Sequence, residues 1–284
     1  MSFISSLSSS NAMTDEEFSL FKTLVYDECG IHLKPEKKDF LQNRINQRMR
    51  AIGIKSYYRY YKLITGDGSG YKGELLTFLD VITINETSFY RNKPQLDLFQ
   101  NIALPELLHR KRAKNDFSLK IWSAGCSMGQ EPYTIAMILN DVMTDIKGWK
   151  VTILASDLSL TVLEAAQQGI YPKAKMDGID ENSARKYFIE KDDNFQARDE
   201  LKRLITFDFH NLMYDNGFSN IDVVFCRNVL IYFDMETQKE VIERFHQCLA
   251  PKGYLFLGHT ETLQGVNDNF VFIHKDKGTV YQKK

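Results

Sequence analysis

The chain has 284 residues, of which 43% are hydrophobic and 26% are charged, and its formal net charge is -1 at pH 7. This composition is typical of a globular protein with a sizeable core, and the near-zero charge argues against bulk nucleic-acid binding. No apolar run approaches the roughly 18 residues of a membrane span. The four cysteines and six histidines are scattered without zinc-site spacing. We therefore expect a cytoplasmic protein without a metal site, membrane insertion or a nucleic-acid partner.

Residues 14–84 are predicted to form a small all-α domain. Thr14 and Glu17 have the spacing of a capping box, in which each side chain accepts a hydrogen bond from the other residue's backbone amide. Apolar residues then recur at helical spacing until a glycine stops the pattern. The signals predict four helices, which begin near Thr14, Pro35, Ser56 and after a Gly66–Gly70 loop, and end near Gly30, Gly53, Ile64 and Ile82.

From residue 116 to 284, short β-rich segments alternate with helical ones, after a linker helix region at 85–115. Such alternation is typical of a parallel sheet covered by helices. Strands are predicted at Leu119–Ser123, Val151–Ser156, Ile221–Cys226 and Tyr254–Leu257. Helices are predicted to begin at Glu131, to end at Gln168 and to span Met235–Leu249.

Two other segments depart from this alternation. Near the end, Phe270–His274 and Thr279–Gln282 flank Lys275–Gly278, which predicts an antiparallel hairpin with a four-residue loop. Residues 170–203 interrupt the pattern between two core strands and are interpreted as a compact inserted subdomain. The fold class is therefore α/β, with a Rossmann-like sheet that ends in an antiparallel hairpin.

The turn after the first predicted strand is a candidate ligand site. Gly125 and Gly129 allow backbone to approach a ligand closely, and Asp157 ends the next strand, where a carboxylate can accept hydrogen bonds from both ribose hydroxyls. The turn lacks the glycine pattern of a dinucleotide site, and Glu131 would repel a pyrophosphate. S-adenosylmethionine, which has a ribose and a sulfonium cation but no phosphate, fits better. Asp157 acting only as a helix cap is the alternative interpretation.

The chain resembles the CheR-type chemoreceptor glutamate O-methyltransferases over nearly its whole length from Thr14. The resemblance is carried by blocks of sequence that follow one another in the family's order. These blocks are Asn85–Arg91, Gly129–Tyr133, Ala155–Asp157, Phe225–Phe233 and Leu257–Glu261. Met128 and Gln130 depart from the usual residues of the turn.

The resemblance implies a role for each matching position. Asn85, Thr87 and Arg91 would meet the methionine end of the cofactor, and Glu131 its amino group. Asp157 would hold the ribose. The adenine and the sulfur would be lined by Asn211, Leu212, Asn228 and Val229. Arg91 would pair with the cofactor's carboxylate or face the substrate. Apart from the resemblance, Tyr232 stands at the carboxyl end of its strand beside Asn228, where its hydroxyl could orient the substrate carboxylate; a core tyrosine is the alternative interpretation. Methyl transfer leaves S-adenosylhomocysteine. The family also carries a small β-subdomain at 170–203, which in some members grips a receptor peptide.

The reaction that the resemblance implies needs no general base. A glutamate carboxylate is ionised at pH 7, since its pKa lies near about 4.3. The absence of a Ser/His/Asp or Cys/His constellation from the sequence is therefore consistent with methyl transfer to a carboxylate. Two alternatives stay open: a methyltransferase for RNA or another acidic partner, and a non-catalytic module that senses the cofactor.

Residues 31–62 carry nine basic side chains against only Glu36 and Asp39. A solvated helix face is the common meaning of such a run. Given the resemblance, we expect it to dock the acidic cytoplasmic helical bundle of a methyl-accepting chemoreceptor, because complementary charge raises the encounter rate. The predicted docking residues are Lys37, Lys38, Arg44, Arg48 and Arg50.

Overall fold

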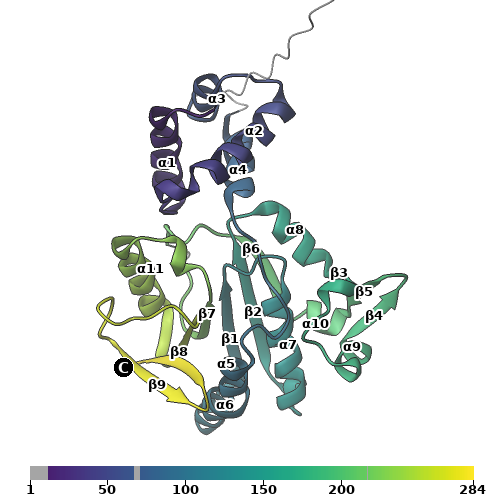
Figure 1. Cartoon of the computed structure of the whole chain (residues 1–284). Coiled ribbons are helices and arrows are strands. Elements are labelled where there is room, and N and C mark those ends of the chain that lie inside the picture. The colour runs from purple at the N-terminus through teal and green to yellow at the C-terminus, as the bar shows by residue number, and fades with distance from the viewer. Residues whose placement is uncertain (1–11, 67–70, 216) are drawn as a thin grey trace, which may run out of the picture. The chain divides into compact units, whose positions relative to one another are not determined.

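The computed structural model describes residues 12–66, 71–215 and 217–284. The chain divides into two compact units, one ending at Ile82 and the other comprising Thr83–Lys284 (Figure 1). Residues 67–70, most of the predicted glycine-rich loop, lie outside the described residues.

The first unit is helical. Its helices are α1 (Asp15–Cys29), the 3-10 turn η1 (Pro35–Lys37), α2 (Lys38–Ile52), α3 (Tyr57–Ile64) and α4 (Tyr71–Ile82). Local signals set the ends as predicted. Thr14 and Glu17 form the capping box of α1, and Ser56 caps α3. Gly30 and Gly53 end α1 and α2 with left-handed backbone. Around Phe21, aromatic rings from α3 and α4 fill the interior.

The second unit opens with a nearly continuous helical stretch at the predicted linker. It consists of α5 (Lys93–Leu98), a π-helical turn η2 (Phe99–Ala103) and α6 (Leu104–Ala113). The stretch packs against the sheet: the Gln95 side-chain amide donates to the carbonyl oxygens of Leu257 and Thr279.

A seven-stranded sheet forms the centre of this unit, in the order β6-β2-β1-β7-β8-β10-β9. The first five strands in this order are parallel neighbours, and β10 and β9 are antiparallel. The strands are β1 (Ser118–Ala124), β2 (Lys150–Asp157), β6 (Ile205–Phe209), β7 (Ile221–Cys226), β8 (Leu249–Leu257), β9 (Phe270–Lys275) and β10 (Gly278–Lys283). The predicted α/β fold with a terminal hairpin is therefore confirmed.

Two details of the sheet differ from the sequence prediction. Strand β6 was not among the predicted strands, because its alternating segment Ile205–Phe209 is short and follows the insertion directly. The hairpin loop is shorter than predicted: Lys275 pairs with Gly278, so only Asp276 and Lys277 form the turn. Both have positive φ, as a two-residue hairpin turn with the right twist requires.

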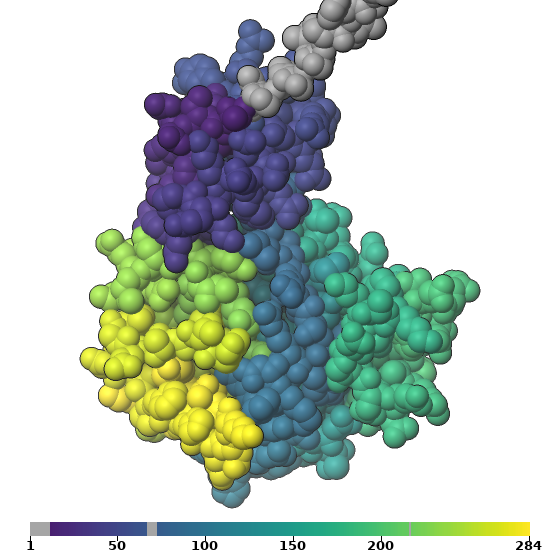
Figure 2. All heavy atoms as spheres, in the orientation of Figure 1, coloured from purple at the N-terminus to yellow at the C-terminus, as the bar shows by residue number. Residues whose placement is uncertain are grey.

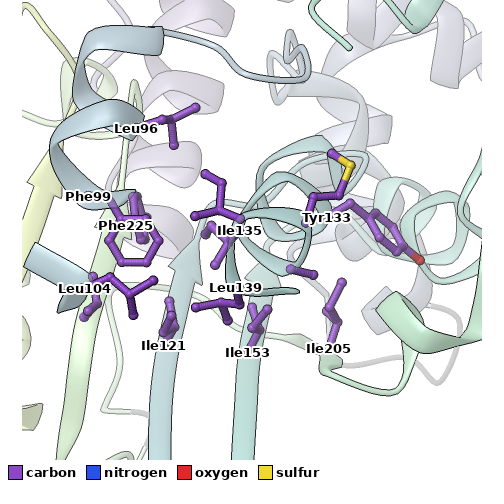
Figure 3. Close-up of a cluster of buried hydrophobic side chains, with 14 of the residues drawn as sticks. Leu96, Phe99, Leu104, Ile121, Tyr133, Ile135, Leu139, Ile153, Ile205 and Phe225 are labelled. Carbon is purple, nitrogen blue, oxygen red and sulfur yellow. The ribbon is translucent and has the colours of Figure 1, made fainter. Parts of the chain in front are cut away.

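Helices cover both faces of the sheet, which makes the strands apolar on both sides. On β1, Ile121 points into one cluster, with side chains of α6 and α7, and Trp122 into the other, with side chains of α11. Figure 3 shows the first cluster, in which Phe99 lies against Phe225 and Leu139 lies between the strand residues. The covering helices are α7 (Gln130–Val142), α8 (Leu160–Gln168) and α11 (Met235–Cys248), with single turns η3 (Ile146–Gly148) and η5 (Leu230–Tyr232).

The inserted segment forms its own three-stranded antiparallel sheet, in the order β3-β5-β4. Its elements are β3 (Ile170–Pro172), η4 (Lys173–Lys175), α9 (Glu181–Tyr187), β4 (Phe188–Lys191), β5 (Asn194–Ala197) and α10 (Asp199–Lys202). In Figure 2 the insertion (teal-green) and the terminal hairpin (yellow) lie on opposite sides of the second unit.

Candidate functional site at the carboxyl ends of the strands

The candidate site lies where the strand order reverses. Strand β1 has β2 on one side and β7 on the other, and all three run parallel. Ligands of open α/β sheets bind at such a switch point, outside the carboxyl ends of the strands. The segments that leave β1, β2 and β7 there are the ones that the sequence predicted to hold a ligand.

The turn after β1 is tightly folded. Gly125, Ser127 and Gly129 all have positive φ. The backbone amides of Gly125 and Cys126 donate to the carbonyl oxygen of Ser156, at 2.8 and 2.9 Å. A Cβ atom at Gly125 would lie 2.5 Å from a methyl group of Val229, so only glycine fits between the turn and that side chain. The turn after β1 thus meets the loop after β7.

Asp157 ends β2 and is 8% exposed. Its two carboxylate oxygens accept hydrogen bonds from the backbone amides of Ser127, at 2.8 Å, and Ser159, at 3.0 Å. Ser159 itself caps α8, because its hydroxyl accepts from the amide of Val162. Asp157 is therefore more than a helix cap, because its carboxylate joins the β1 turn to the end of β2.

The segment Asn85–Arg91 is tied to the same turn. The Ser127 hydroxyl donates to the carbonyl oxygen of Asn85 at 2.9 Å, and the Arg91 guanidinium donates to the carbonyl oxygen of Glu86 at 2.9 Å. Thr87 is half-buried in this segment. The structure therefore brings this first sequence block to the strand ends, although it precedes β1 by almost thirty residues.

Glu131 has a partner that the sequence interpretation did not foresee. One of its oxygens accepts from the Ser123 hydroxyl at 2.7 Å, and the other pairs with the Arg227 guanidinium at 3.2 Å. Arg227 also donates to the carbonyl oxygen of Arg91. Burial lowers the pKa of Arg227, and the charge of Glu131 opposes that change. Because this pair is neutral as a whole, Glu131 by itself does not make the site selective for a cation.

The loop after β7 carries Asn228, Val229 and Tyr232. Asn228 has a φ of 60°, a left-handed conformation that asparagine tolerates better than most residues. Tyr232 is half-buried, and this burial raises the pKa of its hydroxyl, whereas the charge of Arg91 lowers it. The two predicted catalytic residues thus lie close enough to interact electrostatically.

Asn211 and Leu212 follow β6. The preceding residue, His210, donates its backbone amide to the carbonyl oxygen of Asp157 at 3.0 Å. The Asn211 side chain accepts from the amide of Met213, and Leu212 packs in the same apolar cluster as Trp122. This segment therefore lies beside the end of β2, next to the predicted ribose residue.

The insertion contacts the site from another side. Tyr171, on β3, donates its hydroxyl to the carbonyl oxygen of Met128 in the β1 turn, at 2.8 Å. Its ring lies edge-on to Phe89, with the ring centroids 4.9 Å apart. The insertion thus supports both the β1 turn and the Asn85–Arg91 segment.

Several site residues were not predicted from sequence. Ser123, Ser127 and Arg227 connect predicted residues to one another, and Glu261 accepts backbone hydrogen bonds at the ends of β7 and β8. Arg227 and Glu261 lie inside the family-like blocks Phe225–Phe233 and Leu257–Glu261, and this was the only sequence signal for them. Their partners are distant in sequence, so no spacing rule could have identified them.

The basic residues of the first unit differ in their surroundings. Arg48 forms a two-pronged ion pair with Glu74, with N–O distances of 2.8 and 3.0 Å, and Lys38 pairs with Asp15. By contrast, Lys37 and Arg50 are exposed, and Arg44 lies half-buried over the Phe40 ring. Because carboxylates already pair with Lys38 and Arg48, the predicted docking residues best able to attract an acidic partner are Lys37, Arg44 and Arg50.

Other reactive groups are unremarkable. All four cysteines are reduced and buried, and burial raises the pKa of Cys29 and Cys248 to about 12. Across the described residues, no three His, Cys, Asp or Glu side chains gather as metal ligands would. None of the helices in this part of the chain has both the length and the apolar character of a membrane span.

The sequence is similar to known proteins over nearly its whole length. Residues 16–83 match the all-alpha domain of CheR methyltransferases, and residues 85–279 match the SAM binding domain of the same family. The chain is 36% identical over 266 residues to the chemotaxis protein methyltransferase of Borreliella burgdorferi, covering 92% of this chain and 93% of the relative. It is 33% identical over 266 residues to that of Escherichia coli, covering 91% and 88%. The chain therefore belongs to the CheR methyltransferase family, and S-adenosylmethionine is its cofactor.

Proposed function

We propose that this protein transfers methyl groups from S-adenosylmethionine to glutamate carboxylates of a chemoreceptor in the cytoplasm, forming glutamyl methyl esters. The observation that carries this proposal is the convergence of three segments, Asn85–Arg91, the Gly125–Gly129 turn and the loop after β7, at the strand ends. These segments hold no phosphate-binding glycine pattern. The charge of Arg91 lowers the pKa of the Tyr232 hydroxyl, while burial raises it.

The groups present fit the cofactor. Residue 125 has no room for a Cβ atom, and glycine at this position lets a ligand approach the backbone closely. Two backbone amides fix the Asp157 carboxylate at the end of β2, beside the β1 turn. We assign the ribose to Asp157, the adenine to Asn211 and Leu212, and the sulfur side to Asn228 and Val229.

The methionine end would lie on the opposite side of the turn. We assign its carboxylate to Arg91, with Asn85 and Thr87 beside it. Glu131 would receive the amino group, while Arg227 keeps the Glu131 carboxylate oriented through its ion pair. These roles follow the positions that match the family's blocks.

The chemistry requires positioning more than proton transfer. S-adenosylmethionine supplies an activated methyl group, and an ionised glutamate needs no base at neutral pH. Holding the two reactants in line can lower the barrier by roughly 7–11 kcal/mol. Arg91 and the Tyr232 hydroxyl would orient the incoming carboxylate. Partial burial raises the pKa of the Tyr232 hydroxyl further above neutral pH, so the hydroxyl is protonated and can donate a hydrogen bond.

The substrate would dock on the first unit. An acidic helical bundle is complementary to the charges of the exposed Lys37 and Arg50 and the half-buried Arg44, and steering of this kind speeds association at low salt. Lys38 and Arg48 would contribute less, because Asp15 and Glu74 already pair with them.

A labelling experiment tests the function. The protein is incubated with methyl-labelled S-adenosylmethionine and a receptor cytoplasmic fragment, and the same reaction is run with Asp157→Ala. With the unaltered protein we expect base-labile, methanol-releasing label on the receptor. In the Asp157→Ala variant we expect the affinity for S-adenosylhomocysteine to fall roughly 10–150-fold, because a charged hydrogen-bond acceptor is removed. Asp199→Ala, a first-turn position of α10, serves as the control.

Two results would contradict the proposal. Base-stable label on RNA would indicate a nucleic-acid methyltransferase. Tight cofactor binding without transfer to any partner would indicate a sensing module.

A further inference from the structure

Glu261 has an unusual place at the site. It follows β8 and is half-buried, yet its carboxylate binds backbone rather than a cationic side chain. One oxygen accepts from the amides of Asn228, at 2.9 Å, and Gly258. The other accepts from the amide of Ile231 at 3.2 Å. A single carboxylate thereby joins the ends of two neighbouring strands, β7 and β8.

The surroundings of Glu261 are built around these hydrogen bonds. A Cβ atom at Gly258 would lie 2.6 Å from a Glu261 carboxylate oxygen and 2.9 Å from the Asn228 nitrogen, so residue 258 has no room for a side chain. Burial raises the pKa of the Glu261 carboxyl, and the amides of Gly258 and Asn228 act against that increase. Backbone amides thus compensate a carboxylate that would otherwise be costly to bury.

The loop that Glu261 holds is the one that carries the proposed chemistry. Asn228 adopts left-handed backbone, and the Ile231 amide belongs to the turn that presents Tyr232. Val229 is in turn packed against Gly125. If the Glu261 acceptor is lost, two amides on this loop lose their partner, and the loop gains alternative conformations.

We propose that Glu261 is a positioning residue, which fixes the Asn228–Tyr232 loop for cofactor and substrate through backbone hydrogen bonds. The inference rests on the proposed function, because it assigns the loop to the cofactor's sulfur side. Glu261 acts through Asn228, Val229 and Tyr232.

The test compares Glu261→Gln with Glu243→Gln. Glutamine keeps the shape of glutamate but turns an NH2 group toward amides that themselves donate. Glu243, on α11, is a matched control, since its carboxylate accepts from the side chains of Gln247 and Asn267 rather than from the loop after β7. Kd for S-adenosylhomocysteine is measured by calorimetry, and KM and kcat by receptor methylation. Hydrogen exchange of the backbone amides is measured without ligand.

For Glu261→Gln we expect the Kd for S-adenosylhomocysteine and the KM each to rise about tenfold. The amides of Asn228 and Ile231 should exchange faster, while those of β1 and β2 stay protected. Glu243→Gln should match the unchanged protein. A purely structural role would instead reduce the fraction of active enzyme, lowering apparent kcat with Kd and KM unchanged, and this outcome would overturn the proposal.

Two further results are informative. Unchanged exchange at Asn228 and Ile231 would also overturn it. Failure of the unaltered protein to bind S-adenosylhomocysteine would refute the proposed function itself, whereas normal binding with an unaffected Glu261→Gln variant refutes only the positioning role.

Discussion

Buried carboxylates have different partners in the two units: side chains in the helical unit, and both side chains and backbone amides in the α/β unit. In the helical unit, Glu74 joins two side chains, the guanidinium of Arg48 and the hydroxyl of Tyr60. In the α/β unit, Asp157 and Glu261 instead accept from backbone amides at the ends of strands. Glu74 thereby holds three helices together, whereas Asp157 and Glu261 fix the conformation of loops.

This contrast explains why ligand chemistry is expected in only one unit. Loops at strand ends have backbone amides and carbonyls that the sheet does not pair. A side chain that accepts from some of these amides fixes the loop, and the other polar groups of the loop can then face a ligand. In the helical unit the backbone is already bonded within the helices, so its carboxylates and cations are left to pair with each other or to face solvent.

The largest expected effect concerns the Arg227–Glu131 ion pair, which lies in the candidate site and resembles the Arg48–Glu74 pair of the helical unit. Arg227→Met should lower the free energy of unfolding by about 3–5 kcal/mol, because it leaves Glu131 buried and unpaired. Urea unfolding followed by tryptophan fluorescence measures this unit specifically, since both tryptophans, Trp122 and Trp149, lie in it.

The double variant Arg227→Met with Glu131→Gln provides the control. It should recover part of the loss, because no unpaired charge is left. If the double variant is as unstable as the sum of the two single variants, Arg227 and Glu131 do not interact, and the pair has no role in stability.

An intermediate effect is expected for the matching pair in the helical unit. Arg48→Met should destabilise that unit by roughly 1.5–3 kcal/mol, since Glu74 loses a charged partner but keeps the Tyr60 hydroxyl. Hydrogen exchange of the α2 and α4 amides measures the loss. Affinity for S-adenosylhomocysteine should be unchanged. A weakened cofactor site in this variant would contradict the separation of roles between the units.

The smallest effect on stability, with a distinct effect on rate, is expected on the surface. Lys37→Glu with Arg44→Glu should slow receptor methylation at low salt several-fold, because complementary charge speeds association, and added salt should shrink the difference. The control is Lys147→Glu with Lys239→Glu, which changes the charge equally at exposed positions of the other unit. Equal slowing by both double variants would show that only net charge matters.

The sequence by itself determined the secondary structure wherever local physics decides it. The capping box at Thr14, the Ser56 cap and the glycines after α1 and α2 set helix ends through interactions within a few residues. Alternation of strands and helices gave the α/β class, and the quoted blocks gave the family. Where the signal was weak, as at β6 and in the hairpin turn, the prediction failed or was imprecise.

Only the tertiary structure decided which charges pair. The partner of Arg48 is 26 residues away, that of Arg227 is 96 residues away, and Glu261 reaches back 33 residues to Asn228. These distances are set by helix packing and by the order of strands in the sheet. An ion pair or a backbone hydrogen bond forms only where folding brings donor and acceptor within about 3 Å, and no local pattern in the chain encodes that meeting.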